Sequence, residues 1–206
     1  MNATDAAVFI VTAPSGAGKT TLVSRLIAEL PGIAVSVSHT TRPMRPGEVD
    51  GQHYHFVDTA AFESLIAEDG FLEHARVFDN YYGTSVQAVN DCVAAGHDVI
   101  LEIDWQGAEQ ARQKLPDTRS VFILPPSREA LVSRLKSRGQ DAPETIERRT
   151  NEAVEEMQHY KSADFLLVND DFESTLTEFK AIILAERARM ARCHRQHEAL
   201  IKQLLA

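Results

Sequence analysis

Cysteine is scarce in this chain: Cys92 and Cys193 are the only two among 206 residues, and they lie far apart without CxxC spacing. Such spacing excludes a disulfide framework and a zinc site built on paired cysteines. Long hydrophobic runs are absent too, because the apolar stretches at 6–11 and 182–185 are far shorter than the roughly 20 residues that span a bilayer. We therefore expect no membrane partner.

Positive charge is also in short supply. The chain has 21 Lys and Arg against 30 Asp and Glu, a net charge of −9, so no nucleic-acid partner is expected beyond a local face. The first apolar stretch has no basic residue before it, so a secretory signal is not expected and the predicted compartment is the cytoplasm. The remaining composition is typical of a globular protein.

Short apolar runs alternate with segments of helical periodicity. The runs at 8–12, 33–37, 99–104, 121–124 and 165–168 read as strands, and the segments between most of them read as helices. This alternation predicts an α/β fold with a parallel sheet. From Phe172 onward the pattern predicts one long helix.

The sharpest motif is Ala13-Pro-Ser-Gly-Ala-Gly-Lys19-Thr20, which matches GxxxxGK[ST] except that Ala13 replaces the first Gly. Glycine at 16 and 18 lets backbone amides converge on phosphate oxygens, Lys19 can bridge β- and γ-phosphates, and Thr20 can ligate Mg²⁺. The alternative is a plain strand-to-helix turn with a chance lysine. The expected ATP-binding residues are Ala13, Pro14, Ser15, Gly16, Ala17, Gly18, Lys19, Thr20 and Thr21.

Six further motifs occur in order along the chain, at 36–48, 51–54, 80–84, 124–127, 138–139 and 168–171. With these motifs the chain strongly resembles the bacterial guanylate kinases over nearly its whole length. The resemblance implies a P-loop kinase fold in a single domain, 1–206, with a central parallel sheet flanked by helices. Its core would be about 1–36, 84–127 and 160–206, with an inserted GMP-binding subdomain at 37–83 and a helical lid at 128–159.

The resemblance also implies an activity. It predicts in-line transfer of the γ-phosphoryl group of ATP, with Mg²⁺ as cofactor, to GMP and dGMP in purine nucleotide metabolism. Asn169 and Asp170 join the ATP-binding set by the same resemblance. Because the acceptor phosphate is already anionic, positioning and electrostatic stabilisation are expected to suffice, without a general base.

The resemblance assigns an acceptor site as well. Arg42 and Arg45 would hold the GMP phosphate with the hydroxyls of Tyr54 and Tyr82, since arginine presents a planar fork to a phosphate dianion. Two arginines alone could equally be a solvated basic turn. The residues expected to read guanine or contact the acceptor nucleotide are Ser38, Glu73, Thr84, Glu102 and Asp104.

Glu102 departs from the family, which commonly has two aspartates where this chain has Glu102 and Asp104. These carboxylates would assist the Thr20-bound Mg²⁺ indirectly, or would serve as helix caps. Arg134, Arg138 and Arg149 are the expected catalytic arginines of the lid, together with Lys19 and Arg42. On spacing alone, the lid arginines could instead pair with neighbouring glutamates on a solvated surface.

Two alternatives remain for the function: another P-loop nucleoside monophosphate kinase, such as one for thymidylate, and a non-catalytic guanylate-kinase-like module that binds phosphopeptides.

A final expectation concerns assembly. A heptad-like series predicts a homo-oligomer formed through the C-terminal helix. The series is Phe179, Ile183, Glu186, Met190, Cys193, His197, Leu200 and Leu204.

Overall fold

The computed structural model describes residues 6–77, 79–137 and 143–206. Its main sheet has five parallel strands in the order β2-β7-β1-β8-β9. These strands are β1 (Val8–Thr12), β2 (Ile33–Val35), β7 (Asp98–Glu102), β8 (Arg119–Leu124) and β9 (Phe165–Val168). The predicted α/β fold with a central parallel sheet is confirmed.

Helices cover both faces of this sheet. Phe9 and Val11 face α1 (Lys19–Glu29) and α7 (Phe172–Arg187), while Ile10 faces the side of α3 (Val86–Ala94) and α4 (Trp105–Lys114). Because successive side chains of β1 alternate between two buried faces, its first four residues, 8–11, are all apolar. Among the described residues, no helix combines the length and apolar character needed to cross a membrane.

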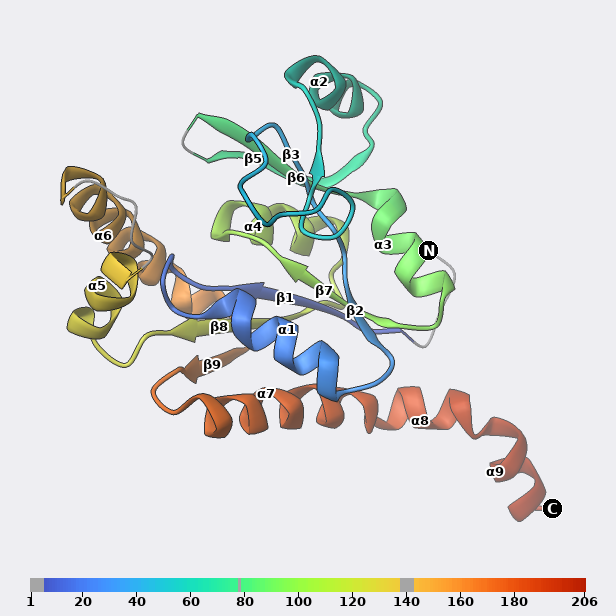
Figure 1. The fold of residues 1–206 in the computed structure, drawn as a ribbon. Coiled ribbons are helices and arrows are strands. Elements are labelled where there is room, and N and C mark those ends of the chain that lie inside the picture. Colours follow the sequence, from blue (N-terminus) through green and yellow to red (C-terminus); the bar gives the residue numbers. More distant parts are fainter. Residues whose placement is uncertain (1–5, 78, 138–142) are drawn as a thin grey trace.

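A second sheet stands above the first in Figure 1, with the strand order β4-β3-β6-β5. Its strands are β3 (His39–Thr40), β4 (His55–Phe56), β5 (Phe71–Val77) and β6 (Asn80–Ser85). Helix α2 (Thr59–Ala67) covers it and begins at Asp58, which accepts a hydrogen bond from the Ala61 amide. Through β5 this sheet packs on α4, the helix that follows β7 of the main sheet.

Helices α5 (Arg128–Ser137) and α6 (Pro143–Met157) form a pair at one side of the molecule in Figure 1. Leu131 and Leu135 of α5 pack against Ala153 of α6 in a small core of their own. A 3₁₀ turn, η1 (Gln158–Ser162), leads from α6 to β9. There the His159 ring stacks on Trp105 of α4, with centroids 3.8 Å apart and planes 5° apart.

The prediction of one long helix after Phe172 is wrong. The segment contains α7, α8 (Met190–Gln196) and α9 (Glu198–Leu204), and Arg189 between the first two has extended backbone at φ −60° and ψ 139°. This turn lets Arg187 and Arg192, from two helices, both reach the buried carboxylate of Asp98. No Gly or Pro marks the break, so helix-stop signals could not reveal it.

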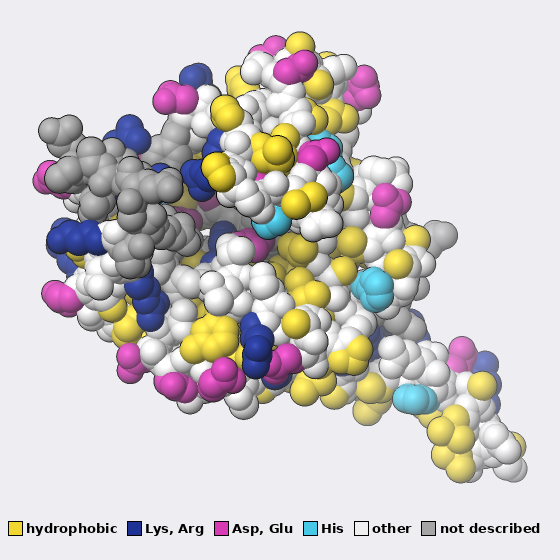
Figure 2. Space-filling view, viewed as in Figure 1, with side chains coloured by type: hydrophobic (Ala, Val, Ile, Leu, Met, Phe, Trp, Pro, Cys, Tyr) yellow, Lys and Arg dark blue, Asp and Glu magenta, His cyan; other side chains and the backbone are white. Residues whose placement is uncertain are grey.

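The heptad-like series therefore does not form one continuous face. Phe179 and Ile183 are fully buried in the chain's own core, whereas Met190 and Leu204 are 80% and 73% exposed. Helices α8 and α9 project from the body, and hydrophobic side chains show on the projecting end in Figure 2.

Candidate active site

The phosphate loop connects the end of β1 to α1. Gly16 and Gly18 have φ angles of 90° and 93°, a region that costs side-chain-bearing residues energy. Gly18 is the residue before the helix, so the amides of Lys19, Thr20 and Thr21 are free to point at a ligand beyond the positive end of α1. The loop thus has the backbone of an anion-binding nest.

Side chains from elsewhere hold this loop in shape. The side-chain amide of Asn169 donates to the Ala17 carbonyl at 2.7 Å, and Arg134 donates to the same carbonyl at 3.3 Å and to the Asn169 carbonyl at 3.0 Å. A Cβ at Gly18 would collide with the Asn169 side chain. Asn169 and Arg134 therefore contact the back of the loop, while Asp170 beside them is exposed.

Four side chains, those of Lys19, Thr20, Glu102 and Asp104, lie where β7 ends. Lys19 Nζ donates to the Ile103 carbonyl at 3.1 Å, and the Thr20 hydroxyl donates to the Glu102 carboxylate. Asp104 begins α4 and accepts a hydrogen bond from the Gly107 amide at 2.8 Å, so it serves as a helix cap in this structure. Within the described ranges, no three His, Cys, Asp or Glu side chains form a metal-binding cluster.

This donor set fits magnesium all the same. Mg²⁺ prefers oxygen ligands and is usually held by one or two protein oxygens, substrate phosphates and water. The Thr20 hydroxyl and the Glu102 carboxylate supply such oxygens next to the phosphate loop.

Two of the three side chains expected to read guanine, Ser38 and Glu73, line one pocket, and the third, Thr84, is fully buried beside them. Glu73 of β5 is 4% exposed and lies beside Thr84 of β6, and the Thr84 hydroxyl is 3.1 Å from that of Ser38. Burial raises the pKa of Glu73 to about 7, mainly because the ionised form is desolvated, while hydrogen bonding with Thr84 works against the shift. The pocket is thus lined by the buried Glu73 carboxylate and the Ser38 hydroxyl, with Glu102 and Asp104 as further carboxylates.

Of the residues expected to hold the acceptor phosphate, Tyr82 lies in β6, and Arg42, Arg45 and Tyr54 lie in the segment between β3 and β4. Arg42 forms a two-pronged contact with Glu48 at 2.7 and 3.0 Å, and its guanidinium lies 5.6 Å from the centre of the Tyr54 ring. Tyr54 and Tyr82 have ring centroids 5.9 Å apart. Burial raises the pKa of Tyr54 to about 12, so its hydroxyl group keeps its proton at neutral pH and can donate a hydrogen bond. Arg45 is exposed, and its amide donates to Glu48 at 2.7 Å.

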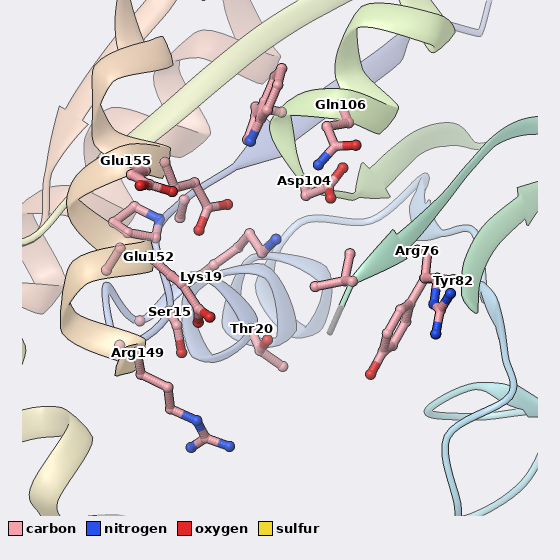
Figure 3. A pocket seen from close by; sticks show the side chains of 18 of the residues that line it. Ser15, Lys19, Thr20, Arg76, Tyr82, Asp104, Gln106, Arg149, Glu152 and Glu155 are labelled. Atoms are coloured by element: carbon pink, nitrogen blue, oxygen red, sulfur yellow. The ribbon is translucent and has the colours of Figure 1, made fainter. Parts of the chain in front are cut away.

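Two cavities that share lining residues connect the phosphate loop with Glu73 and Ser38, whereas Arg42, Arg45 and Thr84 are not among their lining residues. A cavity of about 550 Å³ lies between the phosphate loop, α6 and the second sheet, and a pocket of about 140 Å³ reaches Glu73 and Ser38. Lys19, Tyr54, Tyr82 and Asp104 line both. In Figure 3, Lys19 and Thr20 lie between the α6 side chains on one side and Arg76 and Tyr82 on the other.

The lid arginines have different positions. Arg149 of α6 lines the larger cavity, whereas Arg134 contacts the phosphate loop from behind. Arg138 lies outside the described residues.

Sequence reasoning missed several residues of this site. Glu48, Arg76 and Trp105 were given no role, and neither were Glu152, Glu155 and Glu156, which line the larger cavity from α6. A signal existed for Glu152 and Glu156, which are four residues apart and so share a helix face with Arg149. No sequence signal placed that face against the phosphate loop.

A parallel sheet with a phosphate loop after its central strand, and a second pocket sharing Lys19, defines a P-loop phosphotransferase. Comparison with known proteins gives the family. The guanylate kinase family model matches residues 5–186, and the chain is 57% identical to the guanylate kinase of Sodalis glossinidius (strain morsitans) over 96% of this chain and 97% of the relative. The chain therefore belongs to the guanylate kinase family.

Other relatives agree. The guanylate kinase of Escherichia coli (strain K12) is 56% identical over 96% of this chain and 97% of its own length. The crystal structure of guanylate kinase from Anaplasma phagocytophilum is 32% identical, with a TM-score of 0.75 over 91% of this chain and 89% of that one. An SH3-kinase fragment of tight junction protein 3 shares the fold at 13% identity, with a TM-score of 0.52 over 91% of this chain and 59% of the fragment.

Proposed function

We propose that this enzyme transfers the γ-phosphoryl group of ATP directly to the phosphate of GMP or dGMP, giving ADP and GDP or dGDP. The observation that carries the proposal is the shared wall of the two cavities: Lys19 lines both the space at the phosphate loop and the pocket of Glu73. Two nucleotides bound there would meet phosphate to phosphate. Family membership supports the same reaction, which belongs to purine nucleotide metabolism.

In this proposal the phosphate loop, 13–21, binds the triphosphate of ATP, with Asn169 and Asp170 beside it. An oxygen of the GMP phosphate attacks the γ-phosphorus in line, the bond from that phosphorus to the β-phosphate oxygen breaks, and ADP leaves with the electron pair. Lys19 would bridge the β- and γ-phosphates and stabilise the negative charge that develops on the β-phosphate oxygen as the bond breaks. No side chain needs to remove a proton, because the attacking oxygen is already anionic.

The acceptor is held by the second sheet, which we propose as the GMP-binding subdomain, about 37–83. Arg42, Arg45, Tyr54 and Tyr82 would bind its phosphate. The Glu73 carboxylate would accept hydrogen bonds from guanine N1 and its exocyclic amine, and the hydroxyls of Ser38 and Thr84 would reach O6 or ring nitrogens. Adenine has no such pair of donors, so a buried carboxylate selects for guanine.

The metal and the lid complete the proposal. When bound, Mg²⁺ would neutralise charge between the β- and γ-phosphates, held by Thr20 with Glu102 and Asp104 assisting indirectly. The lid, about 128–159, would bring Arg138 and Arg149 to the transferred group and exclude water, and Arg134 would reach it by leaving the Ala17 and Asn169 carbonyls that it contacts in this structure. The core would comprise about 1–36, 84–127 and 160–206.

The binding-module alternative is disfavoured by the intact loop. The similarity in fold to the tight junction protein 3 fragment does not distinguish a kinase from a binding module, because one fold can have either function. The Lys19 and Thr20 side chains favour a kinase, because a module that only binds a phosphopeptide needs neither. A thymidylate kinase is disfavoured by Glu73, because thymine presents a single ring donor.

We also propose that the chain forms a homo-oligomer through its C-terminal helices and acts in the cytoplasm. The projecting segment exposes Met190, Leu200, Leu204 and Leu205, which a second copy would cover. Light scattering on the full chain and on the Leu200→Glu/Leu204→Glu double variant tests the assembly. A monomer in both samples would refute it.

One assay tests the activity. ADP formation with Mg-ATP is measured across GMP, dGMP, AMP, CMP, UMP and dTMP, with Lys19→Ala as the inactive variant and Lys202→Ala, on exposed α9, as its matched control. We expect turnover with GMP and dGMP alone, lost in Lys19→Ala. Turnover with another acceptor would overturn the pocket assignment, and no turnover at all would favour the binding module.

A further inference from the structure

Glu156, near the end of α6, faces the phosphate loop. It lines the larger cavity together with Ser15, Gly16 and Lys19. The helix is fixed there by Ala153, one turn earlier, which is buried against α5. The carboxylate therefore reaches the loop from a part of α6 that packs on the core.

The groups around Glu156 are those that a phosphate would use. The backbone of Ser15 and the positive charge of Lys19 both favour the ionised form of its carboxylate, while Asp104 at the start of α4 disfavours it. Backbone amides of a phosphate loop and its lysine are the donors that this motif offers to a nucleotide. The two oxygens of a carboxylate beside these donors resemble two oxygens of a phosphate group in charge and spacing.

We propose that Glu156 competes with ATP in the nucleotide-free enzyme: its carboxylate occupies part of the phosphate position beside Ser15 and Lys19, and the triphosphate of ATP displaces it. The inference rests on the proposed binding of ATP at this loop. It adds a competition within the chain, because a triphosphate and an anionic side chain cannot hold the same donors.

The position of the Glu156 carboxylate next to the phosphate loop is an unfavourable one for an anion, so ATP can displace it. Burial raises the pKa of Glu156 to about 7, because desolvation outweighs the attraction of Lys19 and the Ser15 backbone. The ionised carboxylate is thus held at a cost in free energy, which moving it toward water relieves. An incoming triphosphate also repels it at close range, since both are anions.

Two neighbours on α6 sharpen the test. Glu152 lies one turn before Glu156 and has a buried carboxylate oxygen, Oε2, without a hydrogen-bond partner, while its other oxygen is 3.9 Å from Arg148. Glu155 lines the same cavity but is exposed. Glu155→Gln therefore removes the same charge from the same helix without removing the competing carboxylate.

The experiment measures binding of Mg²⁺ with the non-hydrolysable β,γ-imido analogue of ATP by calorimetry, with steady-state kinetics on the same samples. We expect Glu156→Gln to tighten the dissociation constant about tenfold and to lower the KM for ATP, with the KM for GMP unchanged. Glu155→Gln should stay within about twofold of the parent, because exposed charges are screened. A shift confined to ATP is one that a merely structural role would not produce.

The result that overturns the inference is an unchanged or weaker affinity in Glu156→Gln, or an equal gain in both variants. Lys19→Ala separates this failure from failure of the proposed function. If Lys19→Ala abolishes binding of the analogue while Glu156→Gln leaves it unchanged, ATP still binds at the loop and Glu156 alone is misassigned. Melting curves of each variant confirm that it is folded.

Discussion

The carboxylate of Glu73 lies so close to the backbone of Gly107 that a Cβ at position 107 would collide with it. Glu73 belongs to β5 in the second sheet, and Gly107 to the first turn of α4 in the core. A glycine inside a helix normally costs about 1 kcal/mol relative to alanine. Here the missing side chain makes room for the carboxylate that we assign to guanine recognition.

Gly107→Ala should therefore weaken GMP binding while it strengthens the helix. The added methyl group would displace the Glu73 side chain or push the second sheet away from α4. We therefore expect the KM for GMP to rise about tenfold or more and the KM for ATP to change little. Steady-state kinetics with each substrate varied in turn measures this. Equal changes in both KM values would contradict the placement of guanine next to Gly107.

GMP binding should also depend on pH through Glu73. With a pKa of about 7 in the free enzyme, the carboxyl group is protonated at lower pH and then loses the acceptor that guanine needs. The KM for GMP should rise about tenfold for each pH unit below 7, beyond any titration of the GMP phosphate itself. Glu73→Gln should have a high KM for GMP that lacks this component, while the exposed Glu63→Gln should follow the parent enzyme.

The same raised pKa affects folding in the opposite direction. The folded chain holds a proton on Glu73 between the unfolded pKa near 4.5 and the folded pKa near 7. Its contribution to the free energy of unfolding is therefore full below pH 4.5 and is lost as the pH rises to 7. Glu73→Gln should flatten this part of the stability curve measured by chemical denaturation, and an unchanged slope would mean that Glu73 titrates normally.

Arg42 is held ready for a phosphate by Glu48. The two-pronged contact leaves Arg42 and Glu48 only 11% and 17% exposed, and it raises the pKa of Arg42 while lowering that of Glu48. Glu48→Gln keeps the shape but removes the charge that orients the guanidinium. We expect the KM for GMP to rise about tenfold, with a smaller effect on kcat. The reason is that the contact of Arg42 with the GMP phosphate weakens equally in the ground state and in the transition state. A fall in this KM would show instead that Glu48 competes with the phosphate.

The sequence predicts those parts of the site that are built from neighbouring residues. The phosphate loop is one contiguous stretch whose glycines and lysine carry their own geometry, so Gly16, Gly18 and Lys19 could be assigned directly. The strands of the main sheet were equally readable, because each is an apolar run bounded by turn residues. The resemblance to a family carried the acceptor residues, whose separate segments have no local signal of proximity.

Contacts made across the fold could not be predicted. Nothing in the residues around Glu156 indicates that α6 ends beside Ser15, or that Glu73 needs a glycine at 107. The same holds for the break after α7, where two arginines on different helices reach one aspartate. Each depends on packing between elements distant in sequence, and tertiary contacts override local propensity there.

Asp98 is the anchor of the C-terminal region. Its carboxylate is fully buried and accepts hydrogen bonds from Arg187 at 2.7 Å, from Arg192 at 2.7 Å and from the Ala7 amide at 2.8 Å. Removing one partner of a buried ionic network leaves the others without compensation. Asp98→Asn should therefore lower the free energy of unfolding by about 3 kcal/mol, measured by urea denaturation.

Activity should respond differently from stability in this variant. Asp98 starts β7, whereas Glu102, which contacts Thr20, ends it, so kcat and both KM values should stay near those of the parent below the unfolding transition. Asp69→Asn is the matched control, because Asp69 pairs with Lys114 at 3.5 Å while its side chain is 93% exposed, and an exposed pair contributes at most about 1 kcal/mol. An Asp98→Asn variant as stable as Asp69→Asn would contradict this prediction. It would mean that the contacts of Arg187 and Arg192 with Asp98 do not stabilise the turn between α7 and α8.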